Sequence, residues 1–259
     1  MFGLDFEKVQ WSSSDGARLK GWWVPAPQFS DKTVICCHGW GTNSGDILEQ
    51  TWYLAKEGFN LFYMDFRGCG DSERWGLCSL GFYETQDLQS AVRYLRQTRP
   101  GLCRLFGVYG LSMGGVVALN IASKPEGSLI SAIAAEAPFG SFNSSIGRYV
   151  KFHYGLPAFV SRLFLLMLYA RTGWADHEGV SPLRTAAHFG PPHLLLIYGD
   201  KDYLAHPSDG QAIHDTVRKN GRTKSDFWLC PQADHDECFD KDPKTYRQKL
   251  TTFFKQALI

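Results

Sequence analysis

Runs of apolar, β-branched and aromatic residues alternate with longer segments of helical periodicity along most of this chain. The runs predict strands at 6–12, 19–24, 33–37, 60–64, 104–109, 129–135, 193–198 and 226–230. The periodic segments predict helices near 47–57, 82–97, 116–123, 208–220 and 244–257. The inner strands are apolar on both faces and are mostly followed by helices, which is typical of α/β proteins. We expect a mostly parallel, eight-stranded sheet with helices on both faces and an antiparallel pair at its start.

Composition adds a size and a charge to this picture. The chain has 259 residues, of which 44% are hydrophobic, and this is enough for one large core, so we treat residues 1–259 as a single domain. Its formal net charge is +1 with acids and bases interspersed, which argues against a nucleic-acid surface or a polybasic membrane patch. The first residues lack the basic and apolar regions of a secretory signal, and the seven cysteines lack metal-site spacing. We therefore expect a cytoplasmic protein without a bound metal.

The stretch with the most chemical content is Gly110-Leu111-Ser112-Met113-Gly114, directly after the strand at 104–109. A Gly-x-Ser-x-Gly sequence between a buried strand and a helix rich in small residues predicts a nucleophile elbow. The glycines have no Cβ, so strand and helix can approach closely while Ser112 occupies a strained turn with its hydroxyl exposed. The sequence therefore predicts that Ser112 is a nucleophile.

The partners of such a serine follow it along the chain, first an acid and then a histidine. Asp200 and Asp202 come directly after the strand at 193–198, and only His206, His214 and His235 lie beyond them. His235 follows the last predicted strand, and α/β proteins present their chemistry in loops at the carboxyl ends of strands. His206 stands in a turn before a proline and His214 in a solvated helix. We assign the role of base to His235.

Three further motifs give the chain its resemblance to a known family. His-Gly-Trp-Gly at 38–41 is similar to an oxyanion turn, Asp-Phe-Arg-Gly-Cys-Gly-Asp-Ser at 65–72 resembles an Asp-x-Arg-Gly-x-Gly-x-Ser loop, and residues 199–202 resemble a Gly-x-x-Asp acid turn. Over nearly its whole length the chain resembles serine hydrolases of the α/β-hydrolase superfamily. The branch it resembles holds small carboxylesterases, monoacylglycerol-lipase-like enzymes and single-domain relatives of prolyl oligopeptidases. The resemblance makes Asp202 the acid, and we expect His38 and the 65–72 loop to be structural.

The resemblance implies a serine hydrolase that cleaves carboxylic esters through an acyl-enzyme and needs no cofactor. Ser112 would attack the acyl carbonyl, His235 would take its proton, and Asp202 would orient the imidazole. The backbone N–H groups of Trp40 and Met113 would form the oxyanion hole. An unperturbed histidine has a pKa of about 6.5 and a carboxylate partner raises it, so we expect activity to rise between roughly pH 6.5 and 7.5.

The segment 139–190 departs from the alternation, because it separates two strands by far more than one crossover helix requires. Its centre, residues 156–170, is strongly apolar, but it is shorter than the roughly 20 residues of a transmembrane helix and is interrupted by Arg162. Three interpretations stay open: an ordinary helix packed on the sheet, a small helical cap with an apolar underside, and a helix in transient contact with a lipid surface. A cap would favour substrates with apolar acyl groups.

The chemistry is better defined than the substrate. Esters, thioesters and peptides all remain open, because the same acyl-enzyme chemistry serves each. Two alternatives come from other classes, a non-catalytic α/β-hydrolase-fold protein that binds a small ligand and a scaffold that acts through the apolar residues 159–169. The joint presence of Ser112, Asp202 and His235 argues against a lost activity. We expect a small-molecule ester or acyl substrate and no nucleic-acid partner, and the sequence does not define an oligomeric state.

Overall fold

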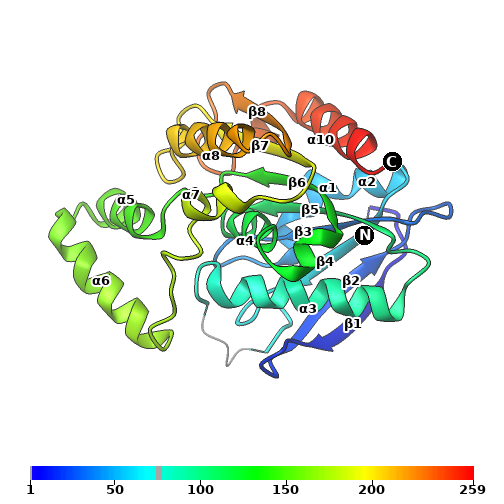
Figure 1. The fold of residues 1–259 in the computed structure, drawn as a ribbon, viewed down its shortest axis with the longest axis horizontal. Helices are drawn as coiled ribbons and strands as arrows, with labels where there is room; N and C mark the ends of the chain where they lie inside the picture. The colour runs from blue at the N-terminus through cyan, green and yellow to red at the C-terminus, as the bar shows by residue number, and fades with distance from the viewer. Residues whose placement is uncertain (1, 74–77) are drawn as a thin grey trace.

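The alternation of strands and helices builds one mixed sheet between two layers of helices (Figure 1). The computed structural model describes residues 2–73 and 78–259. Within these residues the sheet has eight strands, β1 (Glu7–Ser12), β2 (Arg18–Val24), β3 (Lys32–Cys37), β4 (Asn60–Asp65), β5 (Leu105–Leu111), β6 (Ile130–Glu136), β7 (His193–Gly199) and β8 (Lys224–Cys230). The bounds of all eight lie within two residues of the predicted ranges, so the predicted fold is confirmed.

The order of the strands brings the predicted motifs to one edge of the sheet. It is β1-β2-β4-β3-β5-β6-β7-β8, with β1, β2 and β4 joined in antiparallel pairs and the strands from β4 to β8 parallel. The elbow follows β5, the acid turn follows β7 and the histidine loop follows β8. Because these strands are parallel, their carboxyl ends meet at the same edge, where α/β sheets bind ligands.

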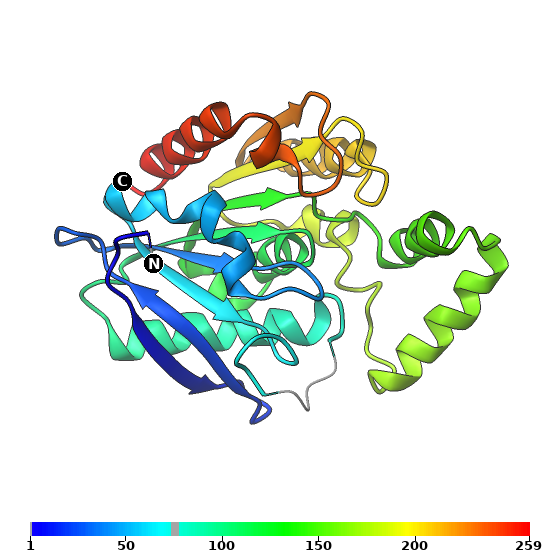
Figure 2. The same ribbon diagram turned by 180° about the vertical axis from the view of Figure 1, so that it is seen from behind.

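Helices cover both faces of the sheet (Figures 1 and 2). One face packs against α3 (Phe82–Thr98), α4 (Met113–Ile121) and α8 (Pro207–Lys219). The other face packs against α1 (Leu48–Thr51), α2 (Tyr53–Lys56), α9 (Cys238–Lys241) and α10 (Pro243–Ala257). Four shorter helical segments lie between these elements: η1 (Ser44–Ile47), η2 (Pro125–Leu129), α7 (Pro182–Thr185) and η3 (Ala186–His188).

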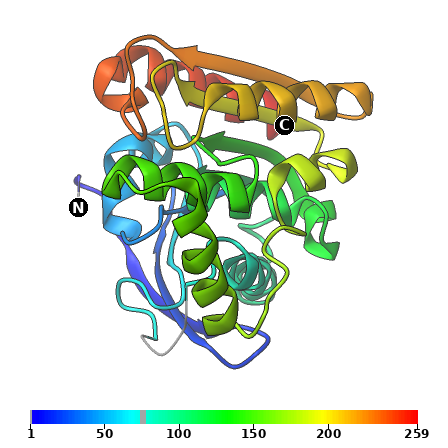
Figure 3. The same ribbon diagram turned by 90° about the vertical axis from the view of Figure 1, so that its left-hand side faces the viewer.

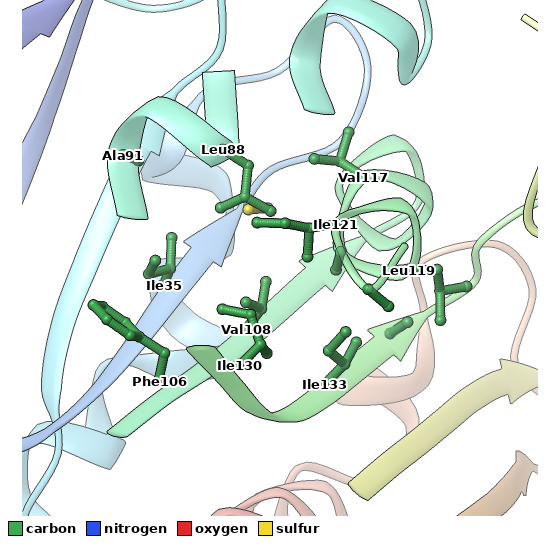
Figure 4. Packing of buried hydrophobic residues seen from close by; sticks show 14 of the residues in the cluster. Ile35, Leu88, Ala91, Phe106, Val108, Val117, Leu119, Ile121, Ile130 and Ile133 are labelled. Atoms are coloured by element: carbon green, nitrogen blue, oxygen red, sulfur yellow. The ribbon is translucent and has the colours of Figure 1, made fainter. Parts of the chain in front are cut away.

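The centre of the first layer shows why the inner strands are apolar on both sides. Ile35 of β3 and Val108 of β5 are fully buried and pack in one cluster with Leu88 of α3 and Val117 and Ile121 of α4 (Figure 4). Full burial of such a side chain stabilises the fold by about 1.5–3 kcal/mol. This packing holds β5 and α4, which flank the elbow, in fixed positions.

One predicted element differs in form. The continuous helix expected over 47–57 is divided into η1, α1 and α2. The amide of Trp52 bonds to Leu48 O at 2.8 Å, four residues back, but Ala55 N bonds to Trp52 O at 3.2 Å, only three residues back. This tighter step interrupts the α-helical bonding, so the segment remains helical but not regular.

The segment 139–190 contains α5 (Phe142–Tyr154) and α6 (Ala158–Arg171), which lie beyond the sheet edge in Figures 1 and 2. The two helices share a small hydrophobic cluster of their own, centred on Phe142, Ile146 and Val150, apart from the clusters on the sheet faces. No single helix of residues 2–73 and 78–259 is long and apolar enough to cross a membrane. By length and composition alone, α5 and Phe159–Arg171 pass as a pair, with a bend of 118° between them.

Candidate active site

Ser112 lies at the turn between β5 and α4, with a φ of 53° and a ψ of −114°. Its amide donates to Glu136 O on β6 at 2.8 Å, and its carbonyl accepts from Val116 N at 3.1 Å. A Cβ at Gly110 would lie 2.2 Å from Gly114 O, so the close approach of strand and helix requires glycine. Backbone bonds on both sides hold Ser112 in a left-handed conformation that non-glycine residues seldom adopt.

The three side chains that the sequence selected for a triad lie in contact. Ser112 Oγ is 3.0 Å from His235 Nε2, and His235 Nδ1 is 2.8 Å from Asp202 Oδ2. Asp202 is 1% exposed, and its other oxygen accepts from Leu204 N at 2.9 Å and Ala205 N at 2.8 Å. These bonds fix the carboxylate, which favours a proton on Nδ1 of the neutral imidazole and leaves Nε2 to accept the serine proton.

The competing candidates have other partners. Asp200 accepts a bond from the backbone of Gln232 at 2.7 Å, which supports the start of the loop that carries His235. His206 caps α8, and His214 Nδ1 bonds to a hydroxyl of β8 at 2.8 Å. Among the described residues neither of these histidines contacts Ser112.

The turn at 38–43 runs beside the elbow, because a Cβ on Gly39 would lie 3.7 Å from Ser112 Cβ. His38 is fully buried, its Nε2 accepts from Phe66 N at 3.0 Å, and its Nδ1 lies 2.7 Å from Gly39 O. Nδ1 therefore carries the proton and donates to the turn. Burial lowers the pKa of His38, which keeps the ring neutral. These bonds give His38 the bracing position expected from the sequence.

Trp40 and Met113, the expected oxyanion donors, both line the cavity beside Ser112. Met113 is the first residue of α4, and the first amides of a helix have no acceptor within it. The same amide lies at the positive end of the helix dipole. An oxyanion that forms beside Ser112 would therefore find a free donor at this position.

The loop at 65–72 holds the neighbouring turns in place. Asp65 accepts from Ser44 N at 2.9 Å and from Asp71 N at 2.8 Å. Arg67 is buried and donates through Nε to both oxygens of Asp87 at 3.0 Å. All of these bonds join parts of the fold, so the loop has the structural role that the sequence suggested.

A cavity of about 630 Å³ opens at Ser112 and His235. This volume lies within the range of small-molecule sites. Apolar side chains from the elbow edge, α5 and α6 form much of its wall, among them Phe139, Phe142, Ile146, Phe164, Leu168 and Leu204. The segment 139–190 thus contributes a large part of the apolar wall.

Asp236 is a second carboxylate at the histidine, and the sequence reasoning did not select it. Its Oδ1 lies 3.3 Å from His235 Nε2, on the side of the ring that also faces Ser112. This oxygen is buried and, among the described residues, has no hydrogen-bond partner, although the side chain as a whole is 39% exposed. Burial raises the pKa of Asp236 above its ordinary value, although the positive charge of the neighbouring His235 opposes this rise. The acidic run 234–237 around His235 was the available signal in the sequence.

The surroundings of His235 change its expected ionisation. Burial by itself would lower the pKa of His235, but the hydrogen bond to Asp202 and the charges of Asp236, Asp202 and Glu136 raise it to about 9. The sequence reasoning counted only one carboxylate partner and therefore expected activity to rise between roughly pH 6.5 and 7.5. The structure adds two more, so a larger share of the imidazole is protonated at neutral pH.

Glu136 is the third carboxylate and is fully buried at the end of β6. Its Oε2 accepts from Tyr109 OH at 3.0 Å and also from Tyr246 OH. Burial raises the pKa of Glu136 to about 7, whereas the tyrosine hydrogen bonds lower it. The only sign of this group in the sequence is one acidic residue at the end of a mostly apolar strand.

Comparison with known proteins identifies the family. The family model described as serine aminopeptidase, S33, matches residues 28–172, which is more than half of the chain. The chain is an α/β-hydrolase of the serine aminopeptidase S33 family. Family, fold and hydrolase class therefore agree with the resemblance drawn from the motifs.

Two relatives match this α/β-hydrolase along most of its length. YqkD of Bacillus subtilis (strain 168) is 28% identical over 245 residues, 93% of this chain and 76% of YqkD. YfhR of Escherichia coli (strain K12) is 24% identical over 257 residues, 97% of this chain and 81% of YfhR.

Solved structures show the same fold. The Pyrococcus furiosus esterase Pf2001 matches with a TM-score of 0.81 at 24% identity, over 99% of this α/β-hydrolase and 94% of the esterase. The Pyrococcus horikoshii acylaminoacyl peptidase matches with a TM-score of 0.76 at 17% identity, over 98% of this chain but 42% of the peptidase. The peptidase therefore contains a further large portion that has no counterpart here.

Proposed function

We propose that this α/β-hydrolase is a serine hydrolase that cleaves carboxylic esters with apolar acyl groups through an acyl-enzyme intermediate. The observation that carries the proposal is the continuous line of contacts from Ser112 Oγ through His235 to Asp202, at a largely apolar cavity. Nucleophile, base and orienting acid within hydrogen-bond reach of one another form the arrangement that acyl transfer requires.

The proposed mechanism follows from these contacts. Ser112 Oγ attacks the ester carbonyl while His235 Nε2 takes its proton, and the carboxylate of Asp202 stabilises the imidazolium that forms. The backbone amides of Trp40 and Met113 stabilise the negative charge on the carbonyl oxygen. His235 then protonates the leaving alcohol. In the second half of the cycle, His235 activates a water molecule that hydrolyses the acyl-enzyme.

The segment 139–190 acts in this proposal as a cap that selects the acyl group. Phe164 and Leu168 on the inner side of α6 line the same cavity as Phe142 and Ile146 of α5, and all four belong to one hydrophobic cluster. An aliphatic chain placed against these side chains leaves water, which is favourable by about 0.8 kcal/mol for each buried methylene.

Labelling with a fluorophosphonate tests the nucleophile directly. The parent protein is expected to form a covalent adduct and to hydrolyse p-nitrophenyl esters, and Ser112→Ala is expected to lose both while it keeps its melting temperature. An unlabelled parent, or a Ser112→Ala variant with parental turnover, would refute the proposal. The first result would favour a non-catalytic ligand-binding protein of the same fold.

An aminopeptidase is the second candidate, because the carboxylates of Asp46 and Asp236 line the cavity and a free amino group would pair with them. Aminoacyl p-nitroanilides, assayed beside the p-nitrophenyl esters, separate the two activities. Higher kcat/KM on the aminoacyl substrates, with a loss in Asp236→Asn, would favour the peptidase.

We also place the protein in the cytoplasm in this proposal. All seven cysteines are free thiols, and five of them are buried. Structural disulfides are rare in reducing compartments, so the free thiols are consistent with a reducing compartment such as the cytoplasm. Fractionation of cells that express the protein, followed by detection in the cytosolic and membrane fractions, tests this placement.

A further inference from the structure

The outer side of α6 is an uncovered apolar stripe. Its exposed residues are Phe159, Arg162, Leu163, Leu166, Met167 and Ala170, which recur at the three- and four-residue steps of one helical face. Phe159 is 71% exposed and Leu163 is 60% exposed. The inner side of the same helix is also apolar, because Phe164 and Leu168 line the cavity. A helix that is hydrophobic all round is normally buried on every side, so the outer face of α6 is apolar surface without a packing partner among the described residues.

The exposed apolar residues are concentrated around this stripe. Eight of the fourteen exposed large hydrophobic side chains among the described residues belong to 152–174. They include Phe152 and Tyr154 at the end of α5 and Trp174 beyond the end of α6. In Figure 3, α5 and α6 lie toward the viewer, in front of the sheet. A concentration of this kind marks an interaction surface, whereas single exposed apolar residues need no explanation.

The charged side chains of α5 and α6 are all basic, although the carboxylate of Glu178 accepts from Asn143 N at 3.2 Å at the start of α5. From residue 142 to 175 the charged side chains are Arg148, Lys151, Arg162 and Arg171, with no Asp or Glu. Arg148 is neutralised by Asp209 at 2.6 Å, and Arg171 lines the cavity. Lys151 and Arg162 are therefore the basic residues available to this surface, and neither forms an ion pair with the described residues. A second copy of the chain would bring like charges together across a two-fold contact. An anionic lipid surface complements both the apolar stripe and the basic residues.

We infer that the outer face of α6, with the end of α5, docks the enzyme on an anionic lipid surface. The inference rests on the proposed function, because the docked helix is also a wall of the acyl cavity. Docking would place α6 between the lipid phase and that cavity, so an apolar ester would move from the lipid to Ser112 with little exposure to water.

The test compares binding to vesicles of phosphatidylcholine alone with binding to vesicles that contain about one third phosphatidylglycerol. We expect the parent to bind the anionic vesicles and Leu163→Glu/Leu166→Glu to lose most of that binding. Arg162→Glu is expected to weaken binding about five-fold or more, because each basic residue near an anionic surface contributes about that factor. None of these residues lines the cavity, so hydrolysis of a water-soluble short-chain ester is expected to remain at the parental rate.

Phe29→Glu is the matched control, because Phe29 is 84% exposed between β2 and β3, far from α6 in the sequence, and its variant is expected to bind like the parent. Equal binding of parent and Leu163→Glu/Leu166→Glu, or no binding by the parent, overturns the inference. A parent that is a dimer by light scattering, does not bind vesicles and becomes a monomer in the double variant would show a second copy as the cover instead. Hydrolysis of the short ester without vesicle binding would refute the docking and support the proposed esterase function. Vesicle binding without any ester hydrolysis would support the docking and refute the esterase function.

Discussion

Removal of the charge on Asp236 is expected to shift the pH dependence of the reaction. Asp236 Oδ1 lies 3.3 Å from His235 Nε2, and the pKa of His235 is about 9. Asp236→Asn keeps the shape of the side chain and removes its negative charge. The imidazolium is then less stable, so the pKa of His235 falls and the rising limb of kcat/KM moves to lower pH.

The size of the shift follows from the groups around the ring. Burial lowers the pKa of His235, and Asp202, Asp236 and Glu136 together raise it from 6.5 to about 9. Opposite charges at this range shift a pKa by about 1–3 pH units, and Asp236 is one of three contributors, so we expect a fall of about one unit. This corresponds to about 1.4 kcal/mol. At neutral pH kcat/KM should rise about three- to tenfold, because more imidazole is neutral although it is a weaker base.

The assay is kcat/KM for one p-nitrophenyl ester from about pH 6 to about 10, corrected for spontaneous hydrolysis. Asp234→Asn is the control, because Asp234 accepts from the backbone of His235 at 2.8 Å and not from its ring. The control should keep the limb of the parent. The reasoning about the second carboxylate would be refuted if kcat/KM of the parent already rose between roughly pH 6.5 and 7.5. It would also be refuted if kcat/KM rose over the same pH range in the parent and in Asp236→Asn.

Three further outcomes are expected. Asp202→Asn should lower kcat by about 10⁴ and Asp200→Asn should have a much smaller effect, since His235 Nδ1 bonds to Asp202 and not to Asp200; a reversed order in the same ester assay would assign the role of acid to Asp200. Leu168→Trp should reduce kcat/KM for long-chain esters relative to acetate, whereas Leu166→Trp on the outer side of α6 should not, as a chain-length series would show. Glu136 keeps its proton up to about pH 7 in the fold, so the free energy of unfolding should fall by roughly 3 kcal/mol as pH rises from 4.5 to 7, and urea titrations of Glu136→Gln should lack this fall.

The sequence predicted the sheet because its signals are local. The strands β3 and β5 are continuous apolar runs, and the elbow has its own glycine pattern, so both could be located without tertiary contacts. His235 was found by its position after a strand, since parallel strands bring such loops to one edge. Position alone left both Asp200 and Asp202 as candidates, and the resemblance to a Gly-x-x-Asp acid turn selected Asp202.

What the sequence could not give depends on contacts between distant segments. Glu136 and Tyr246 are separated by 110 positions, and no periodicity reports that they share a buried hydrogen bond. Asp236 is adjacent to His235 in the chain, but whether its carboxylate faces the ring depends on a backbone turn with a φ of 62°. The number of carboxylates that raise the pKa of His235 depends on such contacts too, because the sequence identified one and the structure has three. The division of residues 44–56 into three short helices likewise depends on individual hydrogen bonds.

The crowding of carboxylates around His235 supports esters over amides as substrates. Asp202, Asp236 and Glu136 all stabilise the imidazolium, so His235 is a stronger base and, once protonated, a weaker acid than an ordinary histidine. Attack by Ser112 uses the base, whereas expulsion of an amine depends strongly on the acid, because an amide nitrogen leaves only after it is protonated. An alkoxide needs less help from the acid. The charges that strengthen the base for attack on the carbonyl therefore weaken the acid that an amine leaving group needs, and for this reason we propose carboxylic esters ahead of peptides for this member of the serine aminopeptidase family.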